Sequence, residues 1–465
     1  MSTAHTTFSR RNFIGLTGLG TAGLLLGDTA YAGGPLVRYD IGGLSETSSI
    51  ITSYRKAVKA MKLLPDSDPR SWTYQAAIHG TLLMPARTAW NTCEHGTEFF
   101  WSWHRMYLYW FERIIRSMSG DSTWTLPYWN WTSKTERQLP PMFRDTSSEL
   151  YISDRDPSMN DGTGSLPDSV VDYSVAFSYL DFPTANDLIQ GTPHGDVHVT
   201  VGGWMASVPT AAQDPIFYLH HANIDRLWNL WLASGGGRTD PLTDKTWKTT
   251  TSTFFDENGH AVTMTACDVL RAAQQLNYSY EGEPAQVLEY CALPIRPYVL
   301  LKTPLFRWPN PPEQLENRIT TFPLFSLSRW RDRLSTILQN QSERLLLELD
   351  NVVAARQPGV VWDLYVGLPP NSTPNPRSPF FVGSMALFGS GVRSDVHPGH
   401  QFTPATFHFD IRRAVSEAFQ FNEQQVDVTF VAHGPLVNGK LSTRPQRAAV
   451  QIGTASVLAA QERRQ

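Results

Sequence analysis

Histidines are the residues of this chain whose number and spacing could do chemistry. The chain has 13 histidines but only three cysteines among 465 residues. Six of the histidines form two groups of three in its first half, namely His79, His95 and His104, and then His194, His198 and His221. A single histidine on an apolar helix face is usually a satisfied core residue. Six buried imidazoles without partners would leave many polar atoms unsatisfied, each at about 1–3 kcal/mol, and metal ions would satisfy them together.

The ligand types indicate which metal would bind. Triplets made only of imidazole favour copper over a di-iron site, which uses Glu-x-x-His motifs, and over a zinc hydrolase site, which usually includes a carboxylate. Three ligands leave each ion open positions, so two coppers about 3.5–4 Å apart can share a diatomic molecule. The residues alone therefore predict a dinuclear copper centre with dioxygen as its bridging ligand.

Apolar residues recur at helical spacing around most of these histidines. The pattern predicts helices over residues 45–64, 71–80, 103–118 and 217–232. His104 and His221 lie on the apolar faces of the last two helices. His194 and His198 are four residues apart, which on a helix points both rings the same way. His95 falls on a loop, and most of residues 132–190 are also expected to be loops.

In the last third of the chain, apolar residues recur at every second position rather than at helical spacing. Strand patterns, several of them with alternating apolar and polar residues, cover residues 360–366, 406–411, 426–430 and 448–458. Such short strands separated by turns favour an antiparallel β sandwich or barrel.

A proline-rich stretch separates the two patterns. Six prolines lie between Pro294 and Pro312, and they predict a surface linker over residues 301–344. We therefore expect a mainly α catalytic domain over residues 33–300, a four-helix bundle around the dicopper site, followed by a smaller β domain over residues 345–465.

Composition excludes several classes of protein. Lys and Arg number 39 against 43 Asp and Glu, and this net charge of −4 argues against a nucleic-acid binder. Three cysteines cannot form a disulfide scaffold, and no C-x-x-C pair indicates a zinc ribbon. The hydrophobic share of 41% is typical of a globular protein rather than a disordered one.

The first 32 residues resemble a twin-arginine export signal. Arg10 and Arg11 precede a weakly apolar, glycine-rich run that is too short to span a bilayer, and Ala30-Tyr31-Ala32 has the form of a cleavage site. A Sec signal or a disordered tail is the alternative. We expect residues 1–32 to be removed, the mature protein to be periplasmic or secreted, and no membrane anchor.

Longer motifs around the histidines resemble those of the tyrosinase and catechol oxidase family of type 3 copper proteins. They are His95-Gly-Thr-Glu-Phe-Phe-Trp-Ser-Trp-His-Arg105 with Glu112, Thr125-Leu-Pro-Tyr-Trp-Asn-Trp131, His194-Gly-Asp-Val-His198, and Asp214-Pro-Ile-Phe-Tyr-Leu-His-His-Ala-Asn-Ile-Asp225. The resemblance covers about residues 35–300. The β domain is similar, more weakly, to the C-terminal domain of plant polyphenol oxidases.

This resemblance implies two copper ions with three ligands each. One ion would be held by His79, His95 and His104, and the other by the second triplet, His194, His198 and His221. In the adjacent pair, His221 matches the ligand, and His220 would pack or hydrogen-bond behind it. Asp225 would either orient an imidazole or pair with Arg226.

Other residues match the family in type and order. Cys93 stands two residues before His95, in the arrangement that fungal tyrosinases and molluscan hemocyanins crosslink through a thioether; a small buried hydrophobe is the alternative. Cys267 and Cys291 could pair in an oxidising compartment. The Tyr278-Ser-Tyr280 motif and Arg38 resemble the structural clasp of the catalytic domain.

The resemblance implies oxidation of o-diphenols to o-quinones by O₂, with weaker hydroxylation of monophenols. Family members that hydroxylate efficiently are thought to use a water held by a glutamate and an asparagine. Here Gln190 and Gly195 stand at those positions, and neither can supply the base. Asp196, Asp187 or a released histidine could substitute.

Two other readings remain open. Molluscan hemocyanins carry oxygen with the same ligands, but they are arrays of many domains. Val208 stands where plant catechol oxidases often place a bulky Phe, which implies an open mouth and favours an enzyme. An unrelated zinc hydrolase is the third reading. The linker and the β domain suggest that residues from about 345 onward cover the copper cleft and keep the chain partly latent.

Overall fold

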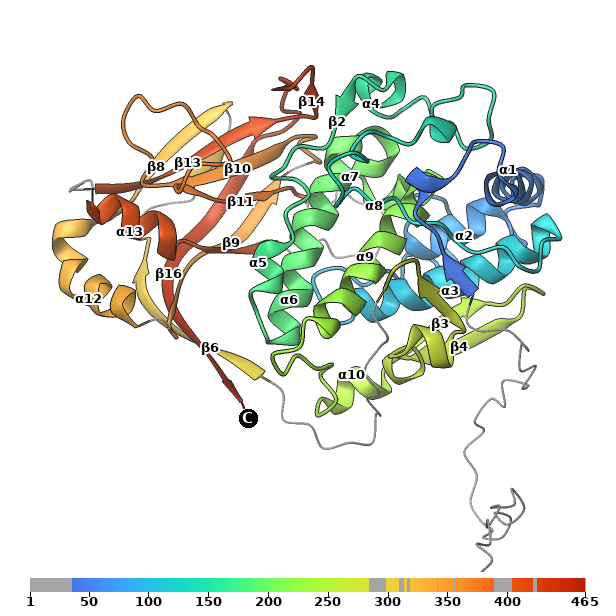
Figure 1. The fold of residues 1–465 in the computed structure, drawn as a ribbon, viewed down its shortest axis with the longest axis horizontal. Coiled ribbons are helices and arrows are strands. Elements are labelled where there is room, and N and C mark those ends of the chain that lie inside the picture. Colours follow the sequence, from blue (N-terminus) through green and yellow to red (C-terminus); the bar gives the residue numbers. More distant parts are fainter. Residues whose placement is uncertain are drawn as a thin grey trace, which may run out of the picture. The chain divides into compact units, whose positions relative to one another are not determined.

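The computed structural model describes residues 36–283, 298–308, 313–315, 318–340, 342–354, 356–388, 404–420 and 425–464. The expected export signal and Cys291 lie outside these residues. Residues 35–465 form one compact unit, in which a helical half and a sheet-rich half each have a hydrophobic core (Figure 1). Among the described residues, no helix has the length and apolarity needed to cross a membrane.

The four helices predicted from hydrophobic spacing are present, and two more segments complete the surroundings of the histidines. They are α1 (Ser49–Lys62), α2 (Trp72–His79), α3 (Phe100–Ser119), α9 (Ile216–Ala233), the π-helical turn η3 (Gln190–Gly195) and α7 (Asp196–Val201). Ser48 and Ser71 cap the first two helices by accepting from backbone N–H groups. Gly120 ends α3 in the left-handed region, with φ 73°.

Short elements fill the rest of the helical half, in agreement with the expected loops. They are β1 (Leu36–Arg38), η1 (Ile41–Gly43), η2 (Pro141–Phe143), α4 (Pro157–Asp161), β2 (Gly164–Ser165), α5 (Ser174–Phe177), α6 (Phe182–Ile189), η4 (Gly203–Ala206), α8 (Val208–Ala211), α10 (Lys245–Thr249), β3 (Thr251–Phe255), β4 (Ala261–Thr265), η5 (Ala266–Asp268), α11 (Ala272–Gln275) and β5 (Tyr278–Tyr280).

The sheet-rich half is a β sandwich of two antiparallel sheets that share one core. One sheet has the order β11-β10-β13-β8, and the other has β12-β9-β16-β6 with β7 beside β16. The strands are β6 (Tyr298–Arg307), β7 (Glu313–Leu315), β8 (Ile319–Ser326), β9 (Arg344–Ala354), β10 (Val361–Val366), β11 (Phe381–Met385), β12 (Ala405–Asp410), β13 (Gln425–His433) and β16 (Val450–Arg464). The helices α12 (Leu327–Gln339) and α13 (Arg412–Gln420) lie against them.

The expected linker over residues 301–344 is wrong for the described part of that stretch. Three strands, β6, β7 and β8, and the helix α12 occupy it and belong to the sandwich. The prediction took proline as a sign of a linker, but Pro304 lies within β6, which is an edge strand. The pairing of β6 with β16 shifts register there, between Val457 and Leu458 of β16. A bulge on an edge strand tolerates a residue that cannot donate a ladder hydrogen bond.

The two halves are joined by backbone pairing as well as by side chains. β14 (Leu436–Val437) forms a hairpin with β15 (Lys440–Leu441) and also pairs with β2 of the helical half. Arg444 donates to the backbone oxygens of Val199 and Thr200 at 2.9 and 3.1 Å. The β sandwich is therefore attached directly to the chain around α7.

A buried charge network closes the helical half, where β1 pairs in parallel with β5. Arg38 donates to Glu112 at 2.7 Å and to the Tyr280 hydroxyl at 2.9 Å. Asp225 accepts hydrogen bonds from Arg105 at 2.5 Å and from the hydroxyls of Tyr278 and Tyr280. Neither expected role of Asp225 is found among the described residues, because its carboxylate contacts this network rather than an imidazole or Arg226.

Replacing Arg38 tests the importance of the network. Arg38→Leu should lower the free energy of unfolding by about 3–5 kcal/mol, because the buried carboxylates of Glu112 and Asp225 would both lose a cationic partner, leaving Glu112 with Arg116 alone. As a control, Lys59→Leu removes an exposed pair with Glu149 and should cost less than about 1 kcal/mol. Urea unfolding followed by tryptophan fluorescence measures both, and equal losses would contradict the prediction.

Candidate metal centre

The structure brings all six predicted histidines together. His79 ends α2, His104 lies in α3, and His221 lies in α9, while His95 is on the loop before α3. His194 is in η3 and His198 in α7. The backbone between them is helical, as expected for the pair, and the non-helical residue is Thr192, two residues before His194. Ring centroids are 5.2–5.7 Å apart in the first triplet and 4.7–5.3 Å apart in the second.

The two triplets face each other. The ring centroids of His104 and His221 are 4.5 Å apart, and those of His95 and His194 are 5.6 Å apart. Potential ligand atoms of His79, His104 and His221 lie within 4.8 Å of one another, as do those of the second triplet together with His220. Two ions held in this cluster would therefore be close neighbours.

Backbone carbonyls fix the rings of four histidines. The Nδ1 atoms of His79, His104, His194 and His198 lie 2.8–3.2 Å from the carbonyl oxygens of Val208, Phe100, Gln190 and Met205, respectively. A carbonyl oxygen only accepts, so each Nδ1 carries the hydrogen and each Nε2 keeps its lone pair. This is the orientation that a metal ligand requires.

The inward nitrogen atoms fit a metal. The Nε2 atoms of His79, His104 and His194 are buried and have no hydrogen-bond partner among the described residues. The Nε2 atoms of His198 and His221 lie only 3.1 Å apart, which requires a proton or a cation between two nitrogen atoms. Buried polar atoms are normally satisfied, so this set of lone pairs matches bound metal ions.

The ligands are neutral without a metal. Burial, with the neighbouring imidazoles, lowers the pKa of His79, His104, His194, His198 and His221 well below the usual value for histidine. Neutral imidazole is the form that coordinates a metal, so little proton competition opposes binding.

His220 is held in the other tautomer. The indole N–H of Trp131 donates to its Nδ1 at 3.1 Å, and indole nitrogen is only a donor. A neutral His220 must therefore carry its hydrogen on Nε2, which leaves no lone pair for a metal. Burial also lowers the pKa of His220 to about 3, so the ring stays neutral. This tautomer distinguishes His220 from His221. The motif contained Trp131, but its contact with His220 was not predicted because the two residues are remote in sequence.

Cys93 lies beside the ligand with which it is expected to crosslink. It is a free, buried cysteine whose Sγ lies 3.3 Å from Nδ1 of His95. The position fits a thioether to the ring, which stays a prediction. Cys267 is disulfide-bonded, whereas its expected partner, Cys291, lies outside the described residues.

Phe388, which directly follows the β11 region of the sandwich, lies against the second triplet. Its ring stacks on the His198 ring, with centroids 3.9 Å apart and an angle of 7° between the planes. It also makes edge-to-face contacts with His194 and His95, at centroid distances of 5.3 and 5.6 Å. No periodicity marks this residue, so sequence reasoning missed it. The β domain therefore reaches the histidine cluster itself.

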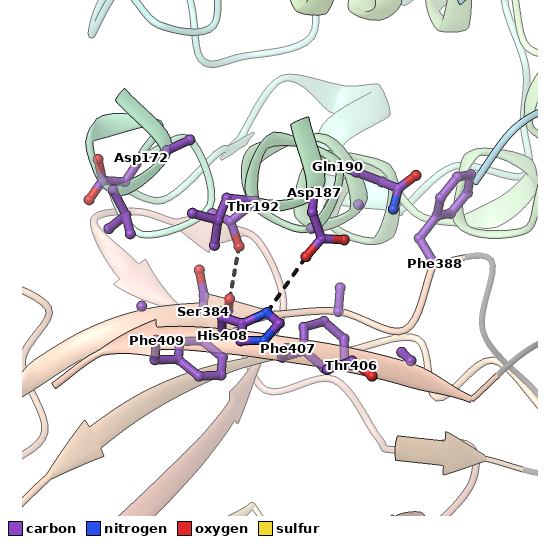
Figure 2. A pocket seen from close by; sticks show the side chains of 18 of the residues that line it. Asp172, Asp187, Gln190, Thr192, Ser384, Phe388, Thr406, Phe407, His408 and Phe409 are labelled. Carbon is purple, nitrogen blue, oxygen red and sulfur yellow. Dashed lines mark hydrogen bonds and ion pairs between the residues drawn. The ribbon is translucent and has the colours of Figure 1, made fainter. Parts of the chain in front are cut away.

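A cavity of about 370 Å³ lies between the two halves and reaches His95. Figure 2 shows Asp187, Gln190 and Thr192 on the helical side, facing Ser384, His408 and Phe388 of the sandwich. Its walls combine aromatic rings with a few polar groups, as in sites for small organic molecules.

The other predicted site residues have structural partners. Gln190 accepts from the backbone N–H of Gly96 at 2.7 Å and so holds the loop of His95. Gly195 lies under Phe388, where an added Cβ would approach the Phe388 Cβ to 3.3 Å. Val208 is buried and supplies the carbonyl for His79, and it is not among the residues that line the cavity.

Sequence comparisons match these regions to known proteins. The common central domain of tyrosinase matches residues 69–175 and 172–234, and the polyphenol oxidase middle domain matches residues 241–290. A domain of unknown function matches residues 326–460.

Curated relatives match about half of the chain. The tyrosinase HcTyr1 of Hahella sp. is 34% identical over 282 residues, which are 49% of this chain and 59% of the relative. The latent, chloroplastic polyphenol oxidase of Prunus armeniaca is 34% identical over 280 residues, 50% of this chain and 47% of the relative. The chain thus spans about half the length of these relatives.

Solved structures share the fold over most of the chain. Latent apple tyrosinase aligns with a TM-score of 0.60 at 24% identity, covering 92% of this chain and 98% of that one. A latent aurone synthase aligns with a TM-score of 0.62 at 20% identity, covering 93% and 90%. The matched domains, the relatives and the histidine cluster agree, and the chain belongs to the tyrosinase and polyphenol oxidase family of type 3 copper proteins.

Proposed function

We propose that the protein is a dicopper polyphenol oxidase that oxidises o-diphenols to o-quinones with O₂ and hydroxylates monophenols more slowly. The observation that carries the proposal is the cluster of six histidines, five of them buried, in which four rings are turned so that their Nε2 lone pairs point into the cluster. Two copper ions bound there would take two electrons from each diphenol and pass them to O₂. Two diphenols and one O₂ would then give two quinones and two waters.

The chain's own residues would position both reactants. Backbone carbonyls hold four of the six histidine rings, and the cavity beside His95 offers an aromatic-lined path for a planar phenol. Phe388 occupies the face of His198 that a phenol ring would need. Substrate access therefore requires this ring to move.

The ligand assignment predicts separate outcomes for neighbouring histidines. His104→Ala or His221→Ala should lose one copper per chain and essentially all oxidase activity, because the two-electron oxidation of a diphenol would require both ions. His220→Ala is the matched control and should retain about two coppers, because its Nε2 carries a hydrogen. Copper analysis of the purified chains measures this, and loss of copper from the His220 variant alone would refute the assignment.

The position of Phe388 predicts latency. Phe388→Ala should raise the initial rate of catechol oxidation by the uncleaved chain, since the ring would no longer cover His198. Phe306→Ala removes a ring of the sandwich that packs on Trp330 and does not line the cavity, and it should leave the rate near that of the parent. Cleavage between residues 283 and 298, ahead of β6, or mild detergent should also activate the parent. Unchanged turnover in the Phe388 variant with intact copper would favour a purely structural β domain.

The proton-transfer groups predict a preference for diphenols. Binding a monophenol as phenolate removes a proton with a pKa near 10, and a positioned base is worth about 10²–10⁴ in rate. Neither Gln190 nor Gly195 supplies one, so tyrosine should be hydroxylated slowly and with a lag while catechol is oxidised fast.

Restoring the base should reverse this preference. Gln190→Glu with Gly195→Asn should raise the ratio of monophenol to diphenol rates. The pair is best tested in a Phe388→Ala chain, because a side chain at position 195 would crowd Phe388. Parent turnover of tyrosine as fast as that of L-DOPA would overturn the argument.

An oxygen carrier is the second candidate function. The Phe388 ring covers His198, and O₂ is far smaller than a phenol, so a site covered in this way favours O₂ over a phenol. Catechol separates the two functions. An oxidase freed of Phe388 forms coloured quinone, whereas a carrier binds O₂ without turnover. We further propose that the twin-arginine segment exports the protein to the periplasm or the medium.

A further inference from the structure

The helical backbone that carries His194 and His198 is interrupted just before the first of them. In η3, Thr192 has φ −120° and ψ 121°, which are extended rather than helical angles, two residues before the ligand. His194 is fully buried, and its Nδ1 donates to the backbone oxygen of Gln190 on the other side of this interruption. Side-chain contacts hold the chain where the helix is interrupted.

Those contacts converge on Asp196, which lies between His194 and His198 in the chain. Its Oδ2 is 2.8 Å from the Thr192 hydroxyl and 2.7 Å from the hydroxyl of Ser384. The Thr192 hydroxyl also lies 2.8 Å from the backbone oxygen of Ser384, as the dashed line in Figure 2 shows. Asp196 and Ser384 are both buried, so hydrogen bonds here are not exchanged for water.

Ser384 belongs to the other half of the molecule. It lies in β11, opposite Asp363 of β10, and this pairing fixes its backbone. Its hydroxyl is also 3.0 Å from the backbone oxygen of Ser169. A strand of the sandwich thus contacts the turn before one ligand and the carboxylate between two ligands.

We propose that Ser384 is a positioning residue for the second copper: the β domain braces the turn of His194 through the Ser384–Thr192–Asp196 contacts. The brace slows loss of the ion held by His194, His198 and His221. The β domain would then retain the metal at the same site that its Phe388 covers. This inference rests on the proposed dicopper site, and only the second ion should depend on it.

Copper release from the full chain tests the brace. Both ions are loaded, a chelator is added, and the loss of each is followed by metal analysis. Ser384→Ala should speed the loss of one copper by about 10–100-fold, the usual effect of removing a group that orients a ligand, and should leave the other unchanged. Ser384→Thr keeps the hydroxyl and should restore the slow rate.

Two further variants separate bracing from general docking of the halves. His408→Gln removes another contact between the two halves, the ion pair between Nδ1 of His408 and the Asp187 carboxylate at 3.7 Å. This variant should not change the rate of copper release. Thr192→Val should resemble Ser384→Ala, and the double variant should release copper no faster than either single one, because both belong to one set of contacts.

The outcomes distinguish this inference from the proposed function. A parent chain that never binds two coppers refutes the dicopper site. If the parent binds two, release at the parent rate from Ser384→Ala refutes the brace alone. Equal acceleration of both ions, or the same acceleration by His408→Gln, also refutes it, because the effect would then come from domain separation.

Discussion

The centre depends on one interaction, the hydrogen bond from an imidazole Nδ1 to a backbone carbonyl. It fixes both the tautomer and the direction of the ring, so that Nε2 meets its neighbours without a proton. For His104 and His194 the carbonyl lies four residues earlier in the same segment. For His79 and His198 it comes from residues 208 and 205, so one short stretch of chain orients a ligand in each triplet. Displacing that stretch would disturb both halves of the centre.

Periodicity predicted the parts of the fold that local sequence controls. The apolar faces of α1, α3 and α9 are visible as stripes, and strands β10, β12, β13 and β16 as alternation. The linker failed because Pro304 is tolerated only through a bulge against β16, which lies some 150 residues away in the sequence. Such pairing leaves no signal in the local pattern.

The site divides in the same way. The six histidines were identified from type, spacing and motif, and the structure gathers them. The hydrogen-bond partners that fix the tautomers of these histidines come from segments that are remote in sequence. Trp131 is the partner of His220, and the carbonyl of Val208 is the partner of His79. The choice between His220 and His221 shows the difference. The motif resemblance selected His221, but it gave no physical reason. The structure supplies one, because the indole N–H of Trp131 fixes the tautomer of His220. Phe388 and Ser384 likewise required the packed sandwich.

The contacts between the halves differ in kind. Some are hydrogen bonds to charged groups: Glu462 accepts from the backbone of Leu180 at 2.6 Å, and Arg444 donates to the backbone of α7. Hydrogen bonds to charged groups contribute about 1.5–3 kcal/mol each. Phe388 contacts the ligands only through its ring, and an aromatic pair contributes about 0.5–1.5 kcal/mol beyond its buried area. Moving this one ring therefore costs less than separating the halves, so the proposed phenol substrate could reach the histidines while the polar contacts between the halves stay formed.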